Sequence, residues 1–395
     1  PAEATKSYLN IPALISAAEV TDCDAVHPGY GFLAENAGFA EVCKSCRITF
    51  IGPSVENIRL MGHKSKAREA AIKAGLPVVS GSEGAINSDK AARKTAKKIG
   101  YPIILKATAG GGGRGMRIVH EENELANSLK MAQAESAAAF GNREVYMEKY
   151  IHSPRHIEVQ ILGDNHGNQI QLFERDCSIQ RRHQKLIEES PSPSINEKLR
   201  RKMGEAALKL VKKIGYTSAG TVEFLLDEDH KFYFMEMNTR IQVEHPVTEM
   251  ITGIDIIKEQ ILIASGQKLS ITQSAVKHIG HSIECRVNAE DPETFAPSSG
   301  TLAEVFLPGG PGVRVDSAIY AGCVISPHYD SLIAKIIVHA SDRHEAIARM
   351  KRALGELHID GVKTTVPLLS RILHSEEFRD GNITTRFLEE FGFNA

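Results

Sequence analysis

The stretch that most constrains the fold of this chain is Phe232–Met250, which reads FYFMEMNTRIQVEHPVTEM. Apolar and polar residues alternate through its first half, a pattern typical of a half-buried β-strand. If this strand stays extended, one face carries five polar or charged side chains spaced about 6–7 Å apart. These are Glu236, Asn238, Arg240, Gln242 and Glu244. A solvated edge strand would explain the stretch by itself, so the neighbouring segments must decide.

The segment before this stretch makes the polar face a candidate active site. TVEFLLD leads into the turn-like residues Glu228–His230, a pattern that predicts a β-hairpin with Glu223 beside Glu236. Two carboxylates and the oxygen of Asn238 form a hard-oxygen site that suits Mg²⁺ rather than Zn²⁺. Arg240 adds a planar fork that matches a small oxyanion.

Size and charge exclude several functional classes. A chain of 395 residues is long enough for two or three domains. Its net charge of −2 gives no general attraction for nucleic acid or anionic membrane, and no apolar run reaches the length of a membrane span. Six scattered cysteines predict reduced thiols in the cytoplasm, and the lone Cys43–Cys46 pair lacks the context of a zinc or redox site.

Helical and strand patterns alternate from Pro1 to about Pro53, which predicts α/β structure with a parallel sheet. SYLNIPALISAAEV is predicted as a helix, and DAVHPGYGF as a strand that enters a glycine-rich turn. The first element is a helix with no strand before it, and Pro1 follows no Met or leader. We therefore expect a fragment or processed form whose first domain begins incomplete.

A glycine-rich loop, Gly110–Gly115, follows the predicted strand Tyr101–Lys106. Its spacing fits the G-x-G-x-x-G dinucleotide fingerprint, but that motif opens into a helix, whereas Met116–Val119 is predicted as a second strand. A Walker A loop would require Lys-Ser/Thr after the last glycine. The pattern that remains is a hairpin loop whose N–H groups fold over phosphates, with Lys106 as an added charge.

Two further segments carry candidate phosphate contacts. Arg181, Arg182, His183 and Lys185 form a basic cluster. No aromatic residues are interleaved with it and the chain has no surplus of basic residues, which argues against nucleic acid binding. We prefer a phosphate-facing loop to a solvated loop, because the cluster would neutralise an anion beside the metal carboxylates. Lys64 lies in the first turn of a predicted helix, where a cation is unfavourable unless an anion lies nearby.

The sequence changes character after the central segment. TEMITGIDIIKEQILIASGQ predicts one helix, and short strands separated by Pro and Gly turns begin at about Lys277. Two helical segments follow, DRHEAIARMKRALGELHI and VPLLSRILHSEEFRDG. This pattern predicts a separate α+β domain, with Arg286 in its first strand.

Together these motifs resemble the biotin carboxylases, which are ATP-grasp enzymes of the biotin-dependent carboxylases. The resemblance extends over essentially the whole chain, and its motifs occur in the family's order. They are HPGYGFLAEN, GGGGRGM, YMEKY, RDCSIQRRHQK and MEMNTRIQVEHPVTEM with Cys285-Arg286. The surrounding sequence is most similar to the biotin carboxylase subunit of bacterial-type acetyl-CoA carboxylase.

The resemblance implies a mixed α/β and α+β chain of three domains. A truncated Rossmann-like N-terminal domain would cover residues 1–60. An ATP-grasp domain would cover 61–275, with a mobile glycine-rich lid over about 79–150. An α+β biotin carboxylase C-terminal domain would cover 276–395.

The resemblance also implies roles for individual residues. The implied ATP contacts are Lys64, Lys106, Gly112, Gly113, Glu148, Lys149, Ile151, His156, Gln180, His183, Glu223 and Glu236. The implied ligands of Mg²⁺ or Mn²⁺ are Glu223, Glu236 and Asn238, and those of bicarbonate are Lys185, Arg240, Gln242 and Val243. Glu244 would be the base for bicarbonate, Arg286 would stabilise the biotin enolate, and Tyr30 would position biotin. The implied catalytic set is Arg240, Glu244, Lys185 and Arg286.

The implied activity is ATP-dependent carboxylation of biotin through carboxyphosphate, the first half-reaction of acetyl-CoA carboxylase in fatty acid synthesis. A biotin carboxylase of another acyl-CoA or pyruvate carboxylase is the alternative. The chain contains no Met-Lys-Met attachment motif, so biotin must arrive on a biotin carboxyl carrier protein. Carboxyltransferase subunits and a homodimer complete the implied assembly, without nucleic acid or membrane. One departure is His63, where several relatives carry Asp; it leaves Lys64 in place.

Three rival interpretations make different predictions. Another bicarbonate-using ATP-grasp ligase, such as a carbamoyl-phosphate synthase half, would not require biotin. A non-catalytic nucleotide-binding regulator predicts a broken set of residues, whereas the two carboxylates, Arg240, Glu244 and Lys185 are all present. The interpretation as a nicotinamide-binding oxidoreductase is supported by the glycine spacing alone. The strand predicted after the loop argues against it, because the dinucleotide motif requires a helix there.

Overall fold

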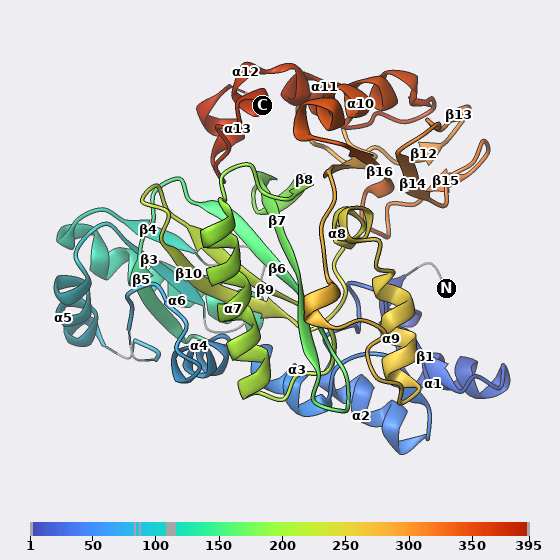
Figure 1. The fold of residues 1–395 in the computed structure, drawn as a ribbon. Helices are drawn as coiled ribbons and strands as arrows, with labels where there is room; N and C mark the ends of the chain where they lie inside the picture. The colour runs from blue at the N-terminus through green and yellow to red at the C-terminus, as the bar shows by residue number, and fades with distance from the viewer. Residues whose placement is uncertain (1–2, 83, 87, 108–115, 393–395) are drawn as a thin grey trace.

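The structure is a computed structural model that describes residues 3–82, 84–86, 88–107 and 116–392 (Figure 1). The predicted glycine-rich loop, with Gly112 and Gly113, lies outside the described residues. In the described ranges, none of the helices has the length and apolar character needed to cross a membrane.

The first unit is a small α/β fold, as predicted. Its strands β1 (Ala25–Val26) and β2 (Thr49–Phe50) pair in parallel. Its helices are η1 (Ala4–Lys6), α1 (Ile11–Val20), α2 (Ala37–Ser45) and α3 (Val55–Met61). The helix predicted from Ser7 begins only at Ile11, because the Asn10 side chain caps it by accepting from the Ala13 amide. The strand predicted to run into the glycine-rich turn ends at Val26, and Gly29 and Gly31 with positive φ turn the chain in HPGYG, as predicted.

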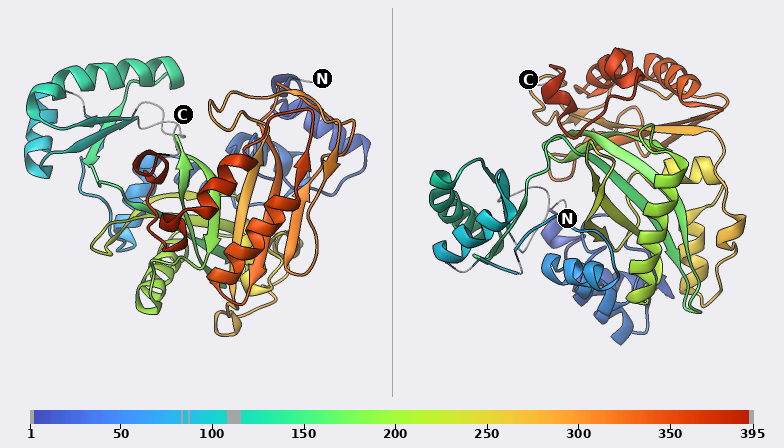
Figure 2. Two further views of the ribbon diagram at one scale, coloured as in Figure 1. Left: turned by 90° about the horizontal axis from the view of Figure 1, so that it is seen from above. Right: turned by 60° about the vertical axis from the view of Figure 1, so that its left-hand side comes forward.

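The second unit begins with α4 (Lys64–Lys73), which places Lys64 in the first turn as predicted. A smaller layer then stands apart from the rest of the chain in both views of Figure 2. It consists of α5 (Asp89–Ile99), β3 (Ile103–Ala107), β4 (Arg117–Val119), α6 (Glu122–Phe140) and β5 (Val145–Lys149). The strands form an antiparallel sheet in the order β4-β3-β5, so the predicted pair of strands around the glycine loop is confirmed.

One eight-stranded antiparallel sheet runs through the centre of the molecule (Figure 1). Its order is β10 (Phe232–Asn238), β9 (Ser218–Leu226), β6 (Arg155–Gly163), β7 (Gln169–Arg181), β8 (Gln184–Ser190), β11 (His281–Asn288), β16 (Leu332–Ala340) and β14 (Val313–Ser317). The amphipathic helix α7 (Glu197–Lys213) packs on β7 and β6, and its apolar face joins a core cluster with residues of β6 and β9. This sheet, called the sheet floor below, therefore positions the polar side chains of the candidate site.

The C-terminal segment, predicted as an α+β domain, shares the central sheet with the segment before it. Ser282–Cys285 of β11 pair with Ile187–Ser190 of β8, so the central sheet continues into it. Helices α10 (Arg343–Glu356) and α11 (Val366–His374) cover this part of the sheet. The remaining short elements are η2 (Gln273–Ala275), β12 (Gly300–Thr301), β13 (Val305–Phe306), β15 (Val324–Ile325), β17 (His358–Ile359), α12 (Glu376–Arg379) and α13 (Phe387–Glu390).

The strand predicted to extend to Glu244 ends at Asn238. Residues 239–244 form a turn, and α8 (His245–Thr252) begins immediately after it with Pro246 in its first turn, a position that suits proline. Only Glu236 and Asn238 of the five predicted side chains therefore lie on the strand. The single helix predicted after Pro246 is also wrong. Gly253, with φ of 69°, separates α8 from α9 (Ile256–Ala264).

Candidate active site

A cleft of about 1710 Å³ opens between the small layer of α5, α6 and strands β3–β5 (the predicted lid layer), the central sheet and the C-terminal segment. It is lined by every described residue for which the family resemblance implies a role in the site. They are Tyr30, Lys64, Lys106, Glu148, Lys149, Ile151, His156, Gln180, His183, Lys185, Glu223, Glu236, Asn238, Arg240, Gln242, Val243, Glu244 and Arg286. Segments far apart in the sequence thus meet at one place.

The predicted carboxylate hairpin is present. Glu223 on β9 is paired with Glu236 on β10 across the two strands. Glu223 accepts hydrogen bonds from the amides of Asn238 (2.6 Å) and Gln242 (2.9 Å), and its second oxygen lies 3.1 Å from His156 Nε2. Burial would raise the pKa of Glu223, but Lys185 and His156 hold it well below its usual value. Glu223 is therefore a permanent anion.

Glu236 lies in a different environment from its partner. Burial and the charge of Glu223 raise the pKa of Glu236, although Lys64 and His156 oppose the shift. Among the described residues, no side chain donates a hydrogen bond to its carboxylate. A half-buried carboxylate beside a second one, without a donor, is stabilised by a cation between them. Glu223, Glu236 and the Asn238 oxygen therefore fit an oxygen-preferring divalent metal ion.

Arg240 is held at the edge of the cleft by several acceptors. Its Nε donates to Glu35 (2.9 Å), and its terminal nitrogens donate to Asn238 Oδ1 (3.2 Å) and to the carbonyl of Ile241 (3.2 Å). Glu35 also accepts from the Thr239 amide at 2.9 Å. Sequence reasoning missed Glu35, although it lies in the HPGYGFLAEN motif, because no local pattern connects it to a turn about 200 positions later.

Glu244 lies between two cations. Lys185 Nζ forms an ion pair with Glu244 and donates to Glu158 at 2.6 Å. Arg286 donates from Nη2 to Glu244 at 2.9 Å and from Nε to Glu188 at 2.6 Å. Although burial opposes the shift, Lys185 and Arg286 hold the pKa of Glu244 well below its usual value. The ionised form is therefore the resting state of this carboxylate.

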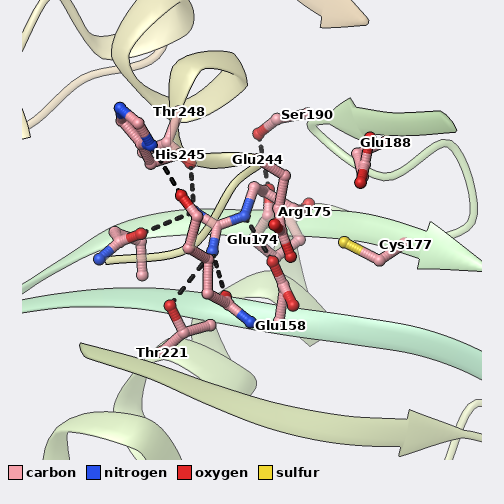
Figure 3. Close-up of polar contacts among 12 residues, drawn as sticks. Glu158, Glu174, Arg175, Cys177, Glu188, Ser190, Thr221, Glu244, His245 and Thr248 are labelled. Carbon is pink, nitrogen blue, oxygen red and sulfur yellow. Dashed lines mark hydrogen bonds and ion pairs between the residues drawn. The ribbon is translucent and has the colours of Figure 1, made fainter. Parts of the chain in front are cut away.

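A fully buried arginine underlies this centre (Figure 3). Arg175 on β7 donates to Glu158 (2.6 Å), Gln160 (2.7 Å), Thr248 (2.9 Å), Thr221 (3.2 Å) and Gln242 (2.9 Å). It thereby fixes Glu158, which holds Lys185, and turns the amide nitrogen of Gln242 toward Glu223. Sequence reasoning also missed Arg175, Glu158 and Glu188, since an isolated charge on a strand gives no signal of burial.

The opposite wall of the cleft is formed by residues of the predicted lid layer. Lys106 Nζ donates to Glu148 at 2.7 Å, and Arg68 Nη1 donates to the other oxygen of Glu148 at 3.1 Å. Lys149 donates to the carbonyls of Tyr101 (2.8 Å) and Gly100 (3.2 Å). Lys106 and Glu148 therefore project from the same face of neighbouring strands, whereas Lys149, the next residue on β5, projects from the other face.

Two other groups complete the cleft. Gln180 Nε2 lies 2.8 Å from His156 Nδ1, so it orients this imidazole toward Glu223. His183 lies at the tip of the β7–β8 hairpin, where burial and Lys106 lower its pKa. Tyr30 lies on the rim and is 40% exposed, which leaves its ring accessible to a ligand.

Comparisons with known families divide the chain into three matches. Residues 1–58 match the biotin carboxylase N-terminal domain, and residues 63–272 match the ATP binding domain of the carbamoyl-phosphate synthase L chain. Residues 284–390 match the biotin carboxylase C-terminal domain.

Individual relatives agree with these matches. The chain is 57% identical to a biotin carboxylase of Nostoc and 56% identical to biotin carboxylase 1 of Bacillus subtilis, covering 99% of this chain and 87% of each relative. A solved complex of biotin carboxylase with β-γ-ATP from Campylobacter jejuni gives a TM-score of 0.95 at 52% identity over 98% of this chain and 86% of that one. The biotin carboxylase domain of a Hydrogenobacter thermophilus 2-oxoglutarate carboxylase, with MgADP and bicarbonate, gives 0.94 at 52% identity over the same shares.

Proposed function

The chain belongs to the biotin carboxylase family, and we propose that it carboxylates carrier-bound biotin as the first half-reaction of an acetyl-CoA carboxylase. One observation carries this proposal. A single cleft brings together the Glu223–Glu236 pair, the Arg240 turn, Lys185 with Glu244, and Arg286. These are the groups needed to bind a nucleotide with its metal, to activate a small oxyanion, and to stabilise a second anion.

ATP is proposed to lie between the lid layer and the sheet floor. Lys106, Glu148 and Lys149 lie on the lid side, with His183 and Gln180 on the hairpin opposite. Lys64 at the start of α4 would supply a further positive charge. Gly112 and Gly113 would cover the phosphates as the lid closes, and Ile151 would lie beside the adenine.

The metal ligands are proposed to be Glu223, Glu236 and Asn238. A bound Mg²⁺ or Mn²⁺ would neutralise charge on the transferring phosphoryl group. The protein's own part is to keep Glu223 ionised through Lys185 and His156, and to hold Asn238 by its bond to Glu223.

Bicarbonate is proposed to bind against Arg240, Gln242, the Val243 backbone and Lys185. Binding an anion there would compete for the positive charge that stabilises ionised Glu244, and so would raise the proton affinity of this carboxylate. Glu244 can then take the bicarbonate proton as the oxygen attacks the γ-phosphorus. The products are ADP and carboxyphosphate.

Biotin is proposed to be carboxylated in the same cleft. Carboxyphosphate releases CO₂ and phosphate, the phosphate takes the ureido proton, and the ureido nitrogen bonds to CO₂. Arg286, fixed by Glu188 and Glu244, would stabilise the negative charge on the ureido oxygen. Tyr30 on the rim would orient the bicyclic ring, and the closed lid would keep water from the labile intermediate.

The assembly is proposed to include a biotin carboxyl carrier protein, carboxyltransferase subunits and a second copy of this chain. The solved relatives include biotin carboxylases of 2-oxoglutarate and pyruvate carboxylases, so another acceptor is the alternative to acetyl-CoA. All six cysteines are free, which supports the cytoplasm as the proposed compartment.

The test measures ADP release with Mg-ATP and bicarbonate, with and without biotin. We expect turnover that requires bicarbonate, rises with biotin and is lost in Glu244→Ala. Turnover that ignores biotin would indicate another ATP-grasp ligase, and tight Mg-ATP binding without turnover would indicate a regulator. Adding carboxyltransferase subunits with acetyl-CoA, pyruvate or 2-oxoglutarate would then identify the acceptor.

A further inference from the structure

Two carbonyl groups of the turn between β10 and α8 accept hydrogen bonds from side chains of neighbouring elements. The carbonyl of Gln242 accepts from His245 Nδ1 at 2.7 Å and from the His245 backbone N–H at 3.3 Å. The carbonyl of Val243, the next residue, accepts from Lys335 Nζ at 2.7 Å. Two consecutive peptide groups are therefore fixed by side chains from α8 and from β16.

Fixing a carbonyl also fixes the N–H group on the other side of the same peptide. A trans peptide is planar, so its C=O and the following N–H point in opposite directions. His245 thus directs the Val243 N–H away from its own ring, and Lys335 directs the Glu244 N–H away from its ammonium group. Among the described residues, no acceptor receives either N–H group. Val243 and Glu244 both line the cleft.

Lys335 is an unusual residue for this position. It is 4% exposed, which is rare for lysine. Its nearest carboxylate is Asp316 at 3.4 Å, with Glu284 at 4.0 Å. Burial raises the pKa of Glu284 well above its usual value, so Asp316 is the charged partner. A buried lysine whose shortest contact is a backbone carbonyl acts on the geometry of that backbone.

His245 provides a matching donor. It is 6% exposed, and burial together with Lys335 and Arg175 lowers its pKa to about 3. The imidazole is therefore neutral at physiological pH. Because Nδ1 faces a carbonyl oxygen, which can only accept, the proton lies on Nδ1.

We propose that Lys335 and His245 are positioning residues that hold the Gln242–Glu244 turn so that the Val243 and Glu244 N–H groups face the bound bicarbonate. This inference rests on the proposed function and extends it to two residues that touch neither substrate. Preorganised N–H groups stabilise an anion without reorganisation when it binds.

The test measures the KM for bicarbonate and for Mg-ATP in Lys335→Met and His245→Phe. We expect the KM for bicarbonate to rise about tenfold in each, the effect of losing one hydrogen bond that orients an anion site. The KM for Mg-ATP should stay within about twofold, because the nucleotide contacts lie elsewhere in the cleft. Lys335→Arg and His245→Asn, which restore a donor, should recover most of the bicarbonate affinity.

Arg349→Met is the matched control, because Arg349 is a partly buried cation that donates to a backbone carbonyl, that of His339, outside the cleft. It should lower thermal stability and leave the KM for bicarbonate unchanged. The proposal is overturned if folded Lys335→Met and His245→Phe keep the wild-type KM for bicarbonate, or if Arg349→Met raises it equally. If Lys335→Met does not fold, the His245→Phe and His245→Asn pair decides. Wild-type turnover without any need for bicarbonate would instead remove the proposed function itself.

Discussion

Carboxylates that line the cleft or lie directly behind it have very different proton affinities because their nearest neighbours differ. Glu244 has Lys185 and Arg286 beside it, and its pKa lies well below the usual value. Burial raises the pKa of Glu188 to about 7 despite its bond to Arg286. Glu236 is also shifted upward, by burial and by Glu223. Glu244 is therefore ionised at neutral pH, whereas Glu188 and Glu236 ionise more readily when a cation lies beside them.

The metal site can be tested at Glu236. We predict that Glu236→Gln raises the Mg²⁺ concentration for half-maximal ADP formation about tenfold or more, because a ligand charge is lost next to Glu223. The measurement is a Mg²⁺ titration at a fixed ATP concentration. Glu228→Gln, an exposed change in the turn of the same hairpin, is the control and should match wild type. Equal Mg²⁺ requirements in both variants would refute the assignment.

Arg286 separates the two parts of the reaction. We predict that Arg286→Met lowers the rate of biotin carboxylation about a hundredfold, because charge stabilisation on the ureido oxygen is lost. Bicarbonate-dependent ADP formation without biotin should change only a few-fold, since Lys185 still keeps Glu244 ionised. Both rates are measured on the same preparation. Arg314→Met, on the neighbouring part of the sheet and outside the cleft, should alter neither. A parallel loss of both rates would place Arg286 in the bicarbonate step.

At the scale of elements, the sequence indicates strands and hairpins better than it indicates which distant strands pair or where a strand ends. Alternation correctly predicts the β9–β10 hairpin and the Glu223–Glu236 pair. It fails after Asn238, because alternation alone does not show where Pro246 starts a helix and forces a turn. That turn, rather than a strand face, brings Arg240 and Glu244 into the cleft. The charged residues beneath it, such as Arg175, could not be found because burial of a polar strand position depends on the opposing layer.

The tip of the β7–β8 hairpin is strained. Arg181 pairs with Gln184, which leaves a two-residue loop of Arg182 and His183 with φ of 48° and 68°. Such loops favour Asn-Gly, because a side chain at positive φ is disfavoured. Both loop residues line the cleft. Because such strain clusters at functional sites, we infer that the side chains of this cleft-lining tip serve nucleotide binding.

This strain gives a third prediction. The double change Arg182→Asn with His183→Gly should stabilise the protein by about 1–2 kcal/mol and raise the KM for Mg-ATP several-fold. Urea unfolding and steady-state kinetics measure the two effects. His230→Gly is the control, because His230 has φ of 57° in the β9–β10 turn outside the cleft. It should stabilise without changing the KM. A stabilised double variant with wild-type KM would mean that the tip has no role in nucleotide binding.

At the scale of the whole molecule, the cleft lies where two parts of one sheet meet. β8 comes from the central segment and β11 from the C-terminal segment, and they carry Glu188 and Arg286 respectively. The sequence change near Lys277 predicts a domain boundary, but composition does not show that the strands on its two sides pair in one sheet. Continuity of the sheet holds Arg286 and Lys335 in a fixed relation to Glu244 and Val243.

A buried ion pair also fastens this junction. Glu189 on β8 accepts from Arg343 Nε at 2.6 Å and lies 2.7 Å from His281 Nε2 on β11. Burial opposes ionisation of Glu189, but Arg343 and His281 outweigh it and lower its pKa from 4.5 to about 2. A depressed carboxylate pKa stabilises the folded state above the unfolded pKa, and this stabilisation is lost as pH falls through the folded pKa.

The final prediction concerns Glu189→Gln. At pH 7 the variant should be less stable than wild type by up to about 3 kcal/mol, the value for a shift of roughly two and a half pKa units in a buried group. That difference should shrink as pH falls from about 4.5 toward 2, because wild-type Glu189 then becomes protonated. Urea unfolding at a series of pH values measures it. Glu376→Gln, an exposed change on α12, should show no such trend. A difference that stays constant or widens on acidification would show that Glu189 does not stabilise the junction through its charge.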